Sequence, residues 1–270
     1  MKNKSVSKRV MQKKLDDVLQ NVVDIFEADD GRSFEEKKKL ALSSLSDQQD
    51  ALLGECLVDV ATRHNTSEQL RDSFWTFGKE IVLPDDILLR NVRESDKESF
   101  LSLQNIYSIM RSMLRHEAYQ NMIWREHTEQ KSLMLSIEKD GIYAGYCGIQ
   151  DLSANIWEIS IELLPEYTNQ GIGFAAITAM LNALRDRLGV SEYRVRIDPK
   201  NHASQRLFEK LGAVPNGISE LWIHDAQGLE QLEAENIHLI DDALTAVAKK
   251  FAVEPRALLS HVLEYKLIWL

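Results

Sequence analysis

The stretch "LLPEYTNQGIGFAAITAML", from Leu163 to Leu181, places two glycines one residue apart where an apolar strand pattern gives way to a helix pattern. A glycine in a helix is less stable than alanine by roughly 0.5–1 kcal/mol, so Gly171 and Gly173 need an explanation. Pro165 ends strand pairing because it has no backbone N–H. The N–H groups from Asn169 to Phe174 would then face an anion at the helix N-terminus, where the helix dipole also favours negative charge. A tight turn without a ligand is the alternative interpretation.

Two other phosphate-binding patterns do not fit this loop. A Walker loop carries Lys and then Ser or Thr after its last glycine, where this chain has Phe174 and Ala175. The dinucleotide fingerprint needs a third glycine in a first βαβ unit, and neither is present. The glycine pair therefore indicates a different kind of anion site.

The chain around this loop alternates between strand and helix patterns. The Asp140–Gly141 pair indicates a hairpin turn. Strands are expected at about 86–95, 131–139, 141–152, 155–164, 193–198, 218–224 and 263–270. Helices are expected at about 95–114, 173–188, 202–212, 230–251 and, as a short piece, 254–262. This order predicts an α/β domain with a mixed sheet over residues 85–270, with a helical insertion at about 226–261 before the last strand.

The preceding residues, 1–84, have amphipathic helix patterns and no strand-period segment. Ser33 followed by Glu36 is a capping box that marks one helix start. We therefore expect a helical N-terminal region that ends near Pro84. It would cover a cleft of the following domain, mediate dimerisation or bind another protein.

Composition describes a globular protein, with 44% hydrophobic and 27% charged residues. Its net charge of −10 disfavours a nucleic-acid surface. The same charge favours a cationic substrate, or else serves solubility. Charges interrupt every apolar run, so no membrane span is expected. The N-terminus does not resemble a secretory signal, and Cys56 and Cys147 lack metal-ligand spacing, so we expect a cytoplasmic protein without a metal.

A second motif lies about thirty residues after the glycine loop, in "RIDPKNHASQRLFEKLGAV". Taken together, the two motifs resemble the GNAT N-acetyltransferases, over residues of about 86–224 and the final strand. The resemblance implies the GNAT fold and acetyl-CoA as the acyl donor. It also implies direct transfer of the acetyl group to the amine of a small molecule or a protein N-terminus.

The family's cofactor-binding positions carry over residue by residue. The loop pattern Q/R-x-x-G-x-G/A falls on "TNQGIG", so a threonine stands where the family usually has Gln or Arg. Asn201 resembles the residue that contacts the pantetheine arm, or is a plain helix N-cap. The resemblance thus implies this cofactor-binding set: Leu163, Leu164, Thr168, Asn169, Gln170, Gly171, Ile172, Gly173, Phe174, Asn201, Ser204 and Phe208.

Acetyl transfer to an amine needs a base, because the protonated amine is not nucleophilic. In "NIWEISIELL", Glu158 and Glu162 share one face of the strand at a period of two. The resemblance indicates acidic residues on this strand as bases, and Glu158 is the first choice and Glu162 the second. Exposed carboxylates or ion pairs are the alternative interpretation of either residue.

One position departs from the common family pattern. Phe208 stands where many members have a tyrosine that protonates the departing sulfur. The pattern "N-x-x-S" without this tyrosine is similar to the branch that acetylates ribosomal-protein N-termini and to antibiotic or small-amine relatives. A non-catalytic acyl-CoA-binding or scaffolding protein is a second hypothesis, and transfer of a longer acyl group is a third. A homodimer is a family-level expectation.

Overall fold

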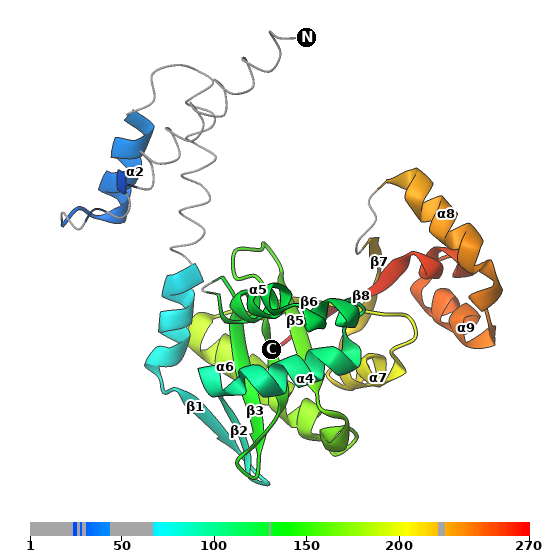
Figure 1. The fold of residues 1–270 in the computed structure, drawn as a ribbon, viewed down its shortest axis with the longest axis horizontal. Coiled ribbons are helices and arrows are strands. Elements are labelled where there is room, and N and C mark those ends of the chain that lie inside the picture. The colour runs from blue at the N-terminus through cyan, green and yellow to red at the C-terminus, as the bar shows by residue number, and fades with distance from the viewer. Residues whose placement is uncertain (1–23, 26–27, 29–30, 44–66, 130, 221–224) are drawn as a thin grey trace. The chain divides into compact units, whose positions relative to one another are not determined.

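A computed structural model describes residues 24–25, 28, 31–43, 67–129, 131–220 and 225–270. The chain divides into two compact units, Met1–Thr66 and Ser67–Leu270 (Figure 1). In the first unit, helix α2 (Phe34–Ser43) begins at the expected capping box. The Ser33 N–H donates to Glu36 Oε2 at 2.8 Å, and the Glu36 N–H donates to Ser33 Oγ at 3.4 Å. The other helix patterns before residue 66 lie outside the described residues.

The boundary between the units lies earlier than the sequence pattern indicated. Residues 67–76 are helical, and strand β1 (Glu80–Leu83) follows them. Both belong to the second unit, because Phe74 is fully buried in its main core and the Phe74 carbonyl accepts a hydrogen bond from Arg187 at 2.9 Å. β1 has four residues, too few for an alternating pattern to stand out.

The second unit is built on one mixed sheet of eight strands, in the order β1-β2-β3-β4-β5-β6-β8-β7. β5 and β6 are parallel, and all other neighbours are antiparallel. Asp140 and Gly141, both with positive φ, form the expected hairpin turn between β3 and β4. The remaining strands are β2 (Ile87–Asn91), β3 (Leu133–Lys139), β4 (Ile142–Ile149), β5 (Trp157–Leu163), β6 (Glu192–Ile197), β7 (Val214–Glu220) and β8 (His261–Ile268).

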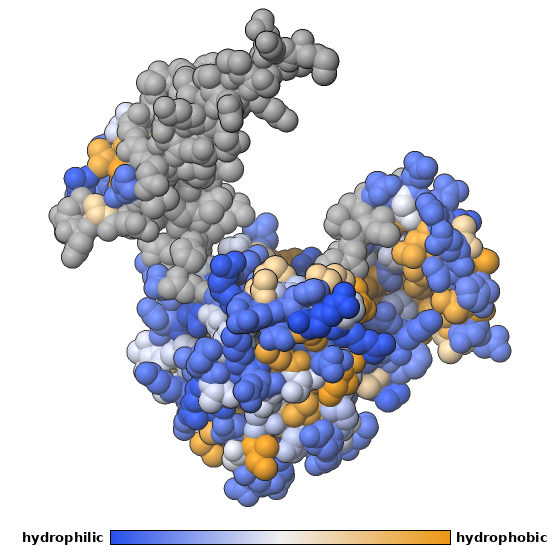
Figure 2. All heavy atoms as spheres, in the orientation of Figure 1, coloured by the Kyte–Doolittle hydropathy of each residue, from blue (hydrophilic) through white to orange (hydrophobic). Residues whose placement is uncertain are grey.

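Helices cover both faces of the sheet (Figure 1). One face packs on α6 and α7 in the main core, to which α9 also contributes. On the other face, α4 and α5 pack over β3 and β4 in a smaller, aromatic core. In Figure 2, apolar residues lie among charged ones where α4 crosses the sheet. The helices are α4 (Lys97–Tyr107), α5 (Glu117–Thr128), α6 (Ile172–Leu188), α7 (His202–Lys210), α8 (Ala226–Asn236) and α9 (Asp242–Phe251).

Short 3-10 turns link these elements, and two of them correct the sequence prediction. The single helix expected at about 230–251 is two helices, α8 and α9, separated by η4 (Ile237–Leu239). Asp241 starts α9, because its Oδ1 accepts from the Leu244 N–H at 2.7 Å. The short helix expected at about 254–262 is the turn η5 (Pro255–Leu259), after which β8 begins. The other turns are η1 (Glu94–Asp96), η2 (Arg111–Arg115) and η3 (Pro165–Tyr167).

A buried ion pair fixes the start of α4 on the sheet. Arg90 of β2 donates to both carboxylate oxygens of Asp96, at 2.7 and 2.8 Å. Ser136 of β3 adds a hydrogen bond to Asp96 Oδ2 at 2.7 Å. Burial acts to raise the pKa of Asp96, but these hydrogen bonds outweigh it and lower the pKa. The position of α4 over β3 and β4 is therefore well defined.

No helix in the described part of the chain is both long and apolar enough to cross a membrane.

Candidate active site

The glycine loop runs from the end of β5, through η3, to the start of α6. Gly171 is the N-cap of α6 and has a φ of 81°, a left-handed conformation that favours glycine. The N-cap supplies no side-chain hydrogen bond. Among the described residues, the N–H groups of Ile172, Gly173 and Phe174 have no acceptor, whereas the Ala175 N–H already bonds to the Gly171 carbonyl. Three free N–H groups at one helix start fit an anionic group such as a phosphate.

The position that a side chain would occupy at Gly173 lies on the packed side of the loop. A Cβ at this buried residue would lie 3.4–3.6 Å from side-chain atoms of Ile161, Leu163 and Leu207. A side chain at Gly173 would therefore point toward β5 and α7, at ordinary contact distances, and not toward the open side of the loop. A Cβ at Gly171 would meet no atom within 4 Å, so Gly171 lies on the open side of the loop.

Side chains of the loop donate hydrogen bonds to backbone carbonyls of the same loop. Thr168 Oγ1 donates to the Pro165 carbonyl at 2.8 Å, and Gln170 Nε2 donates to the Glu166 carbonyl. Asn169 is exposed and has a φ of 58°. The threonine that replaces the family's usual Gln or Arg thus has a structural role here, since it shapes the turn that presents the N–H groups.

Beside the loop, the sheet is split between its two parallel strands. β5 and β6 pair at two positions, Trp157 with Tyr193 and Glu158 with Arg194, and the rest of each strand is unpaired along this edge. The Leu164 N–H donates to the Ala144 carbonyl at 2.9 Å, on the β4 side. Because backbone groups alternate between the edges of a strand, those of Leu163 face the split. An extended ligand could pair there like an added strand.

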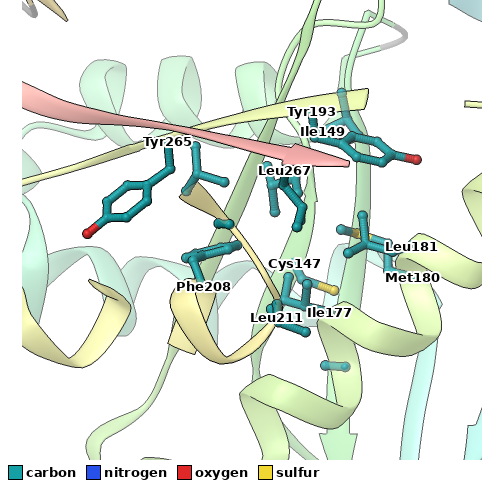
Figure 3. Close-up of a cluster of buried hydrophobic side chains, with 14 of the residues drawn as sticks. Cys147, Ile149, Ile177, Met180, Leu181, Tyr193, Phe208, Leu211, Tyr265 and Leu267 are labelled. Carbon is teal, nitrogen blue, oxygen red and sulfur yellow. The ribbon is translucent and has the colours of Figure 1, made fainter. Parts of the chain in front are cut away.

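The start of α7 lies after the end of β6, which pairs with β8 but not with β5. Asn201 is its N-cap, and its Oδ1 accepts from the Ser204 N–H at 3.0 Å. The capping interpretation of Asn201 is therefore confirmed, and its Nδ2 has no partner among the described residues. Phe208 is 2% exposed and lies in the main core with Leu211 and Ile177 (Figure 3). Its ring packs inside the protein, so its burial gives no support to a cofactor contact.

Glu162 is the carboxylate with the more unusual environment. It is half-buried near the end of β5, on the face covered by α4. Gln104 of α4 donates to Glu162 Oε2 at 2.7 Å, and Tyr146 of β4 also hydrogen-bonds to the carboxylate. Burial raises the pKa of Glu162 to about 7, against the opposing effect of these two hydrogen bonds. A carboxylate with this pKa can accept a proton at neutral pH.

Glu158 lies on the same strand face but is held by cations. Arg196 Nε lies 2.9 and 3.0 Å from the two carboxylate oxygens of Glu158, and Arg194 Nη2 lies 3.2 Å from Oε2. Both arginines come from β6, next to the point where the strands stop pairing. The ion-pair interpretation of Glu158 is thus the one that the geometry shows.

The sequence analysis missed the residues that support Glu162. Gln104 was placed on a helix, but nothing in its spacing distinguishes it from other polar residues of that helix. Behind Tyr146 lies His127, whose ring is 4.6 Å from Tyr146 and 4.3 Å from Phe100, centroid to centroid. Burial lowers the pKa of His127 to about 4, so its imidazole is neutral at pH 7. Contacts between strands and helices distant in sequence create this cluster.

Comparison with known proteins shows which family part of this chain resembles. Residues 86–214 match the family model described as the acetyltransferase (GNAT) domain. A Bacillus subtilis (strain 168) protein, provisionally named a ribosomal protein bS18-alanine N-acetyltransferase, is 27% identical over 138 residues, which are 51% of this chain and 87% of that protein.

Solved structures of similar fold include two with bound ligands. RimJ of Mycobacterium smegmatis, in complex with a CoA disulfide, is 14% identical with a TM-score of 0.47, and the match covers 70% of this chain and 85% of that one. The microcin C7 self-immunity acetyltransferase MccE, in complex with acetyl-CoA and AMP, is 14% identical with a TM-score of 0.49, and the match covers 70% and 96%.

The family match covers the glycine loop, the split strands and α7, which are the parts that the sequence motifs singled out. The hypothesis of an enzyme is therefore confirmed over that of a non-catalytic binding protein. Residues 86–214 form an acetyltransferase domain of the GNAT family, and the protein is an N-acetyltransferase that uses acetyl-CoA as its donor.

Proposed function

We propose that this enzyme acetylates the α-amino group of a protein N-terminus, with Glu162 as the general base. The observation that carries the proposal is the half-buried carboxylate of Glu162, which accepts a hydrogen bond from Gln104 at 2.7 Å near the end of β5, where this strand no longer pairs with β6. Burial there raises the pKa of Glu162 to about 7. The Bacillus subtilis relative, named for the N-terminal alanine of a ribosomal protein, supports this acceptor class.

Proton affinities favour an α-amine over a lysine side chain. An α-ammonium has a pKa of about 7.7–8.0 and a lysine about 10.4. Transfer of the proton to a carboxylate of pKa about 7 is therefore nearly balanced for an α-amine. For lysine it is unfavourable by more than about three pKa units, or roughly 4–5 kcal/mol. The base is thus matched to a protein N-terminus.

Each part of the site has a role in this reaction. Acetyl-CoA supplies the acetyl group as a thioester. The free N–H groups at the start of α6 would hold its pyrophosphate, and the backbone of Leu163 would pair with its pantetheine arm. Glu162 takes one proton from the incoming ammonium, and the neutral amine forms the N–C bond as the C–S bond breaks. CoA leaves as a thiolate, and the second proton on nitrogen passes to the departing sulfur or to water. Gln104 and Tyr146 hold the carboxylate of Glu162 in place.

Glu158 has a supporting role in this proposal. Its charge is balanced by Arg194 and Arg196, which bridge it to β6 at the point of the split. Glu158 therefore fixes the two strands, and Glu162 acts on the amine. With these roles, Glu162 becomes the first choice for the base and Glu158 the second, the reverse of the order inferred from the strand pattern and the family resemblance.

Paired variants test the base. Glu162→Gln should lower kcat about 10²–10⁴-fold, because a general base is removed, and should leave the affinity for acetyl-CoA unchanged. Glu158→Gln is the matched control, four residues away on the same strand face, and should leave the pH dependence of the rate unchanged. Thiol release and calorimetry measure the two quantities. Normal turnover in Glu162→Gln would reject Glu162 as the base.

Two peptides test the acceptor. One has a free N-terminus and no lysine, and the other has an acetylated N-terminus and an internal lysine. We expect mass spectrometry to find acetylation of the first peptide and not of the second. Equal or preferred modification of the lysine peptide would contradict the proposed acceptor.

A further inference from the structure

Five exposed apolar side chains lie close together in sequence at the end of α4 and in the segment that follows it. We define the apolar acceptor surface as Ile106, Tyr107, Ile109, Met110 and Met113, which are 42, 47, 74, 45 and 37% exposed. Single exposed apolar residues are common on proteins and need no explanation. Five within eight residues of sequence form a patch, and such patches mark interaction sites.

This surface begins near the proposed base. Gln104 lies one helical turn before Tyr107 on α4 and donates directly to Glu162. Burial raises the pKa of Tyr107, and the nearby charges of Glu162 and Glu166 add to this effect. The surface therefore begins next to the carboxylate that takes the proton and leads away from it along α4 and η2.

Its length suits the first residues of an extended peptide. One helical turn advances about 5.4 Å, and an extended chain advances about 3.3 Å per residue. An α-amine placed at Glu162 would thus bring roughly the second to fifth residues of its chain over the apolar acceptor surface. Methionine side chains adapt to different shapes, so this surface suits apolar residues as a class.

The charge on this segment differs from that of the whole chain. Residues 99–116 contain two arginines and no Asp or Glu, although the chain has a net charge of −10. Arg111 and Arg115 are both exposed on η2, at the far end of the surface. A peptide with carboxylates beyond its apolar residues would meet these cations.

We propose that the acceptor is an extended protein N-terminus with apolar residues at about positions two to five and acidic residues after them, bound along the apolar acceptor surface. This inference rests on the proposed acetylation of an α-amine at Glu162. It adds the chemistry of the residues that follow the amine.

Peptide kinetics test the inference on the full chain. The probes are a peptide with apolar second to fifth residues and an acidic end, the same peptide with serine and glutamine at those positions, and alanine amide. We expect the apolar peptide to have a KM about tenfold lower than the polar one, because it buries apolar surface. All three are measured by thiol release at saturating acetyl-CoA.

Two methionine variants test whether the apolar acceptor surface causes the difference in KM between the peptides. Met110→Glu should raise KM for the apolar peptide about tenfold and leave the rate with alanine amide unchanged, because that amine does not reach the surface. Met122→Glu is the matched control, since Met122 is 40% exposed on α5. It lies away from the end of α4, because the adjacent Asn121 contacts Lys97 at the start of α4, at 2.8 Å. This control should leave all three rates unchanged.

Each other outcome has a definite meaning. Equal KM values for the two peptides, or an unaffected Met110→Glu variant, would overturn the inference and leave the proposed function intact. Acetyl-CoA binding without acetylation of any of the three amines would overturn the proposed function itself. A Met110→Glu change that converts a dimer to a monomer in sedimentation, with unchanged peptide kinetics, would assign the surface to self-association and overturn the inference.

Discussion

At the scale of single residues, Glu162 depends on opposing effects. Burial favours its neutral form, whereas the hydrogen bonds from Gln104 and Tyr146 favour the carboxylate. The neutral ring of His127 packs against Tyr146 without adding a charge near Glu162. The pKa of about 7 is therefore a balance that a single partner can change.

Removing one partner should shift the pH dependence of the reaction. Gln104→Leu deletes a hydrogen bond to the charged form, so the pKa of Glu162 should rise. The acidic limb of kcat/KM should then move to higher pH by about one unit, with the rate recovering at higher pH. Asn105→Leu, at the exposed next position of α4, is the control. An unmoved limb in Gln104→Leu would contradict the role of this hydrogen bond.

The sequence could place Glu158 and Glu162 on one strand face, but it could not show which of them is the better candidate for the base. The period of two correctly put Glu158 and Glu162 on one face of β5, because alternation depends on the local backbone. The partners that distinguish them come from elsewhere: Arg194 and Arg196 from β6, and Gln104 from α4. A pKa is set by such neighbours, and a single sequence does not show which distant residues become neighbours.

At the scale of elements, the start of α6 is the part most clearly suited to an anion. Its free N–H groups were anticipated from the glycine pair, since a helix start always leaves donors unpaired. The sequence did not show in which direction a Cβ at Gly173 would point, because that direction depends on packing against β5 and α7. A Gly173→Val variant would therefore disturb packing, and it is a poor test of phosphate binding.

A change of charge in the loop is the better test. Asn169→Asp keeps a residue type that tolerates the φ of 58° and adds a carboxylate near the start of α6. The negative charge should interact favourably with the helix dipole, so the melting temperature should not fall. It should repel the pyrophosphate, so the Kd for acetyl-CoA should rise about tenfold at low salt and less at high salt.

Calorimetry of Asn169→Asp is compared with that of Asn155→Asp. Asn155 is exposed in the turn between β4 and β5, at the opposite end of β5 from the loop. The control should bind acetyl-CoA normally. If Asn169→Asp also binds normally at low salt, the start of α6 is not the pyrophosphate site.

At the scale of the whole molecule, the site forms where the pairing of the sheet changes from antiparallel to parallel. β5 and β6 are its parallel pair, connected by α6, and they stop pairing beyond Glu158 and Arg194. Ligands of α/β sheets bind at the carboxyl ends of parallel strands, and this opening is such a place. The free N–H groups of α6 lie after β5, while Glu162 and Gln104 lie on the α4 face. Acetyl-CoA and the amine can therefore reach the site along different elements.

The extent of the unit that supports this site is testable by truncation. All residues of the candidate site, and both hydrophobic cores around the sheet, lie after Thr66. A chain that begins at Ser67 should therefore unfold in one cooperative transition and bind acetyl-CoA within about two-fold of the full chain. Thermal unfolding and calorimetry measure the two properties.

A chain that begins at residue 85, where the sequence pattern placed the boundary, is the informative comparison. It lacks β1 and the fully buried Phe74, whose backbone carbonyl accepts a hydrogen bond from Arg187. Loss of a buried phenylalanine alone destabilises a protein by about 3–5 kcal/mol, a large part of the stability of a typical domain. We expect this shorter chain to melt at a much lower temperature than the chain from Ser67. Equal melting temperatures would show that residues 67–84 are not part of the folded unit and that its boundary lies near Pro84.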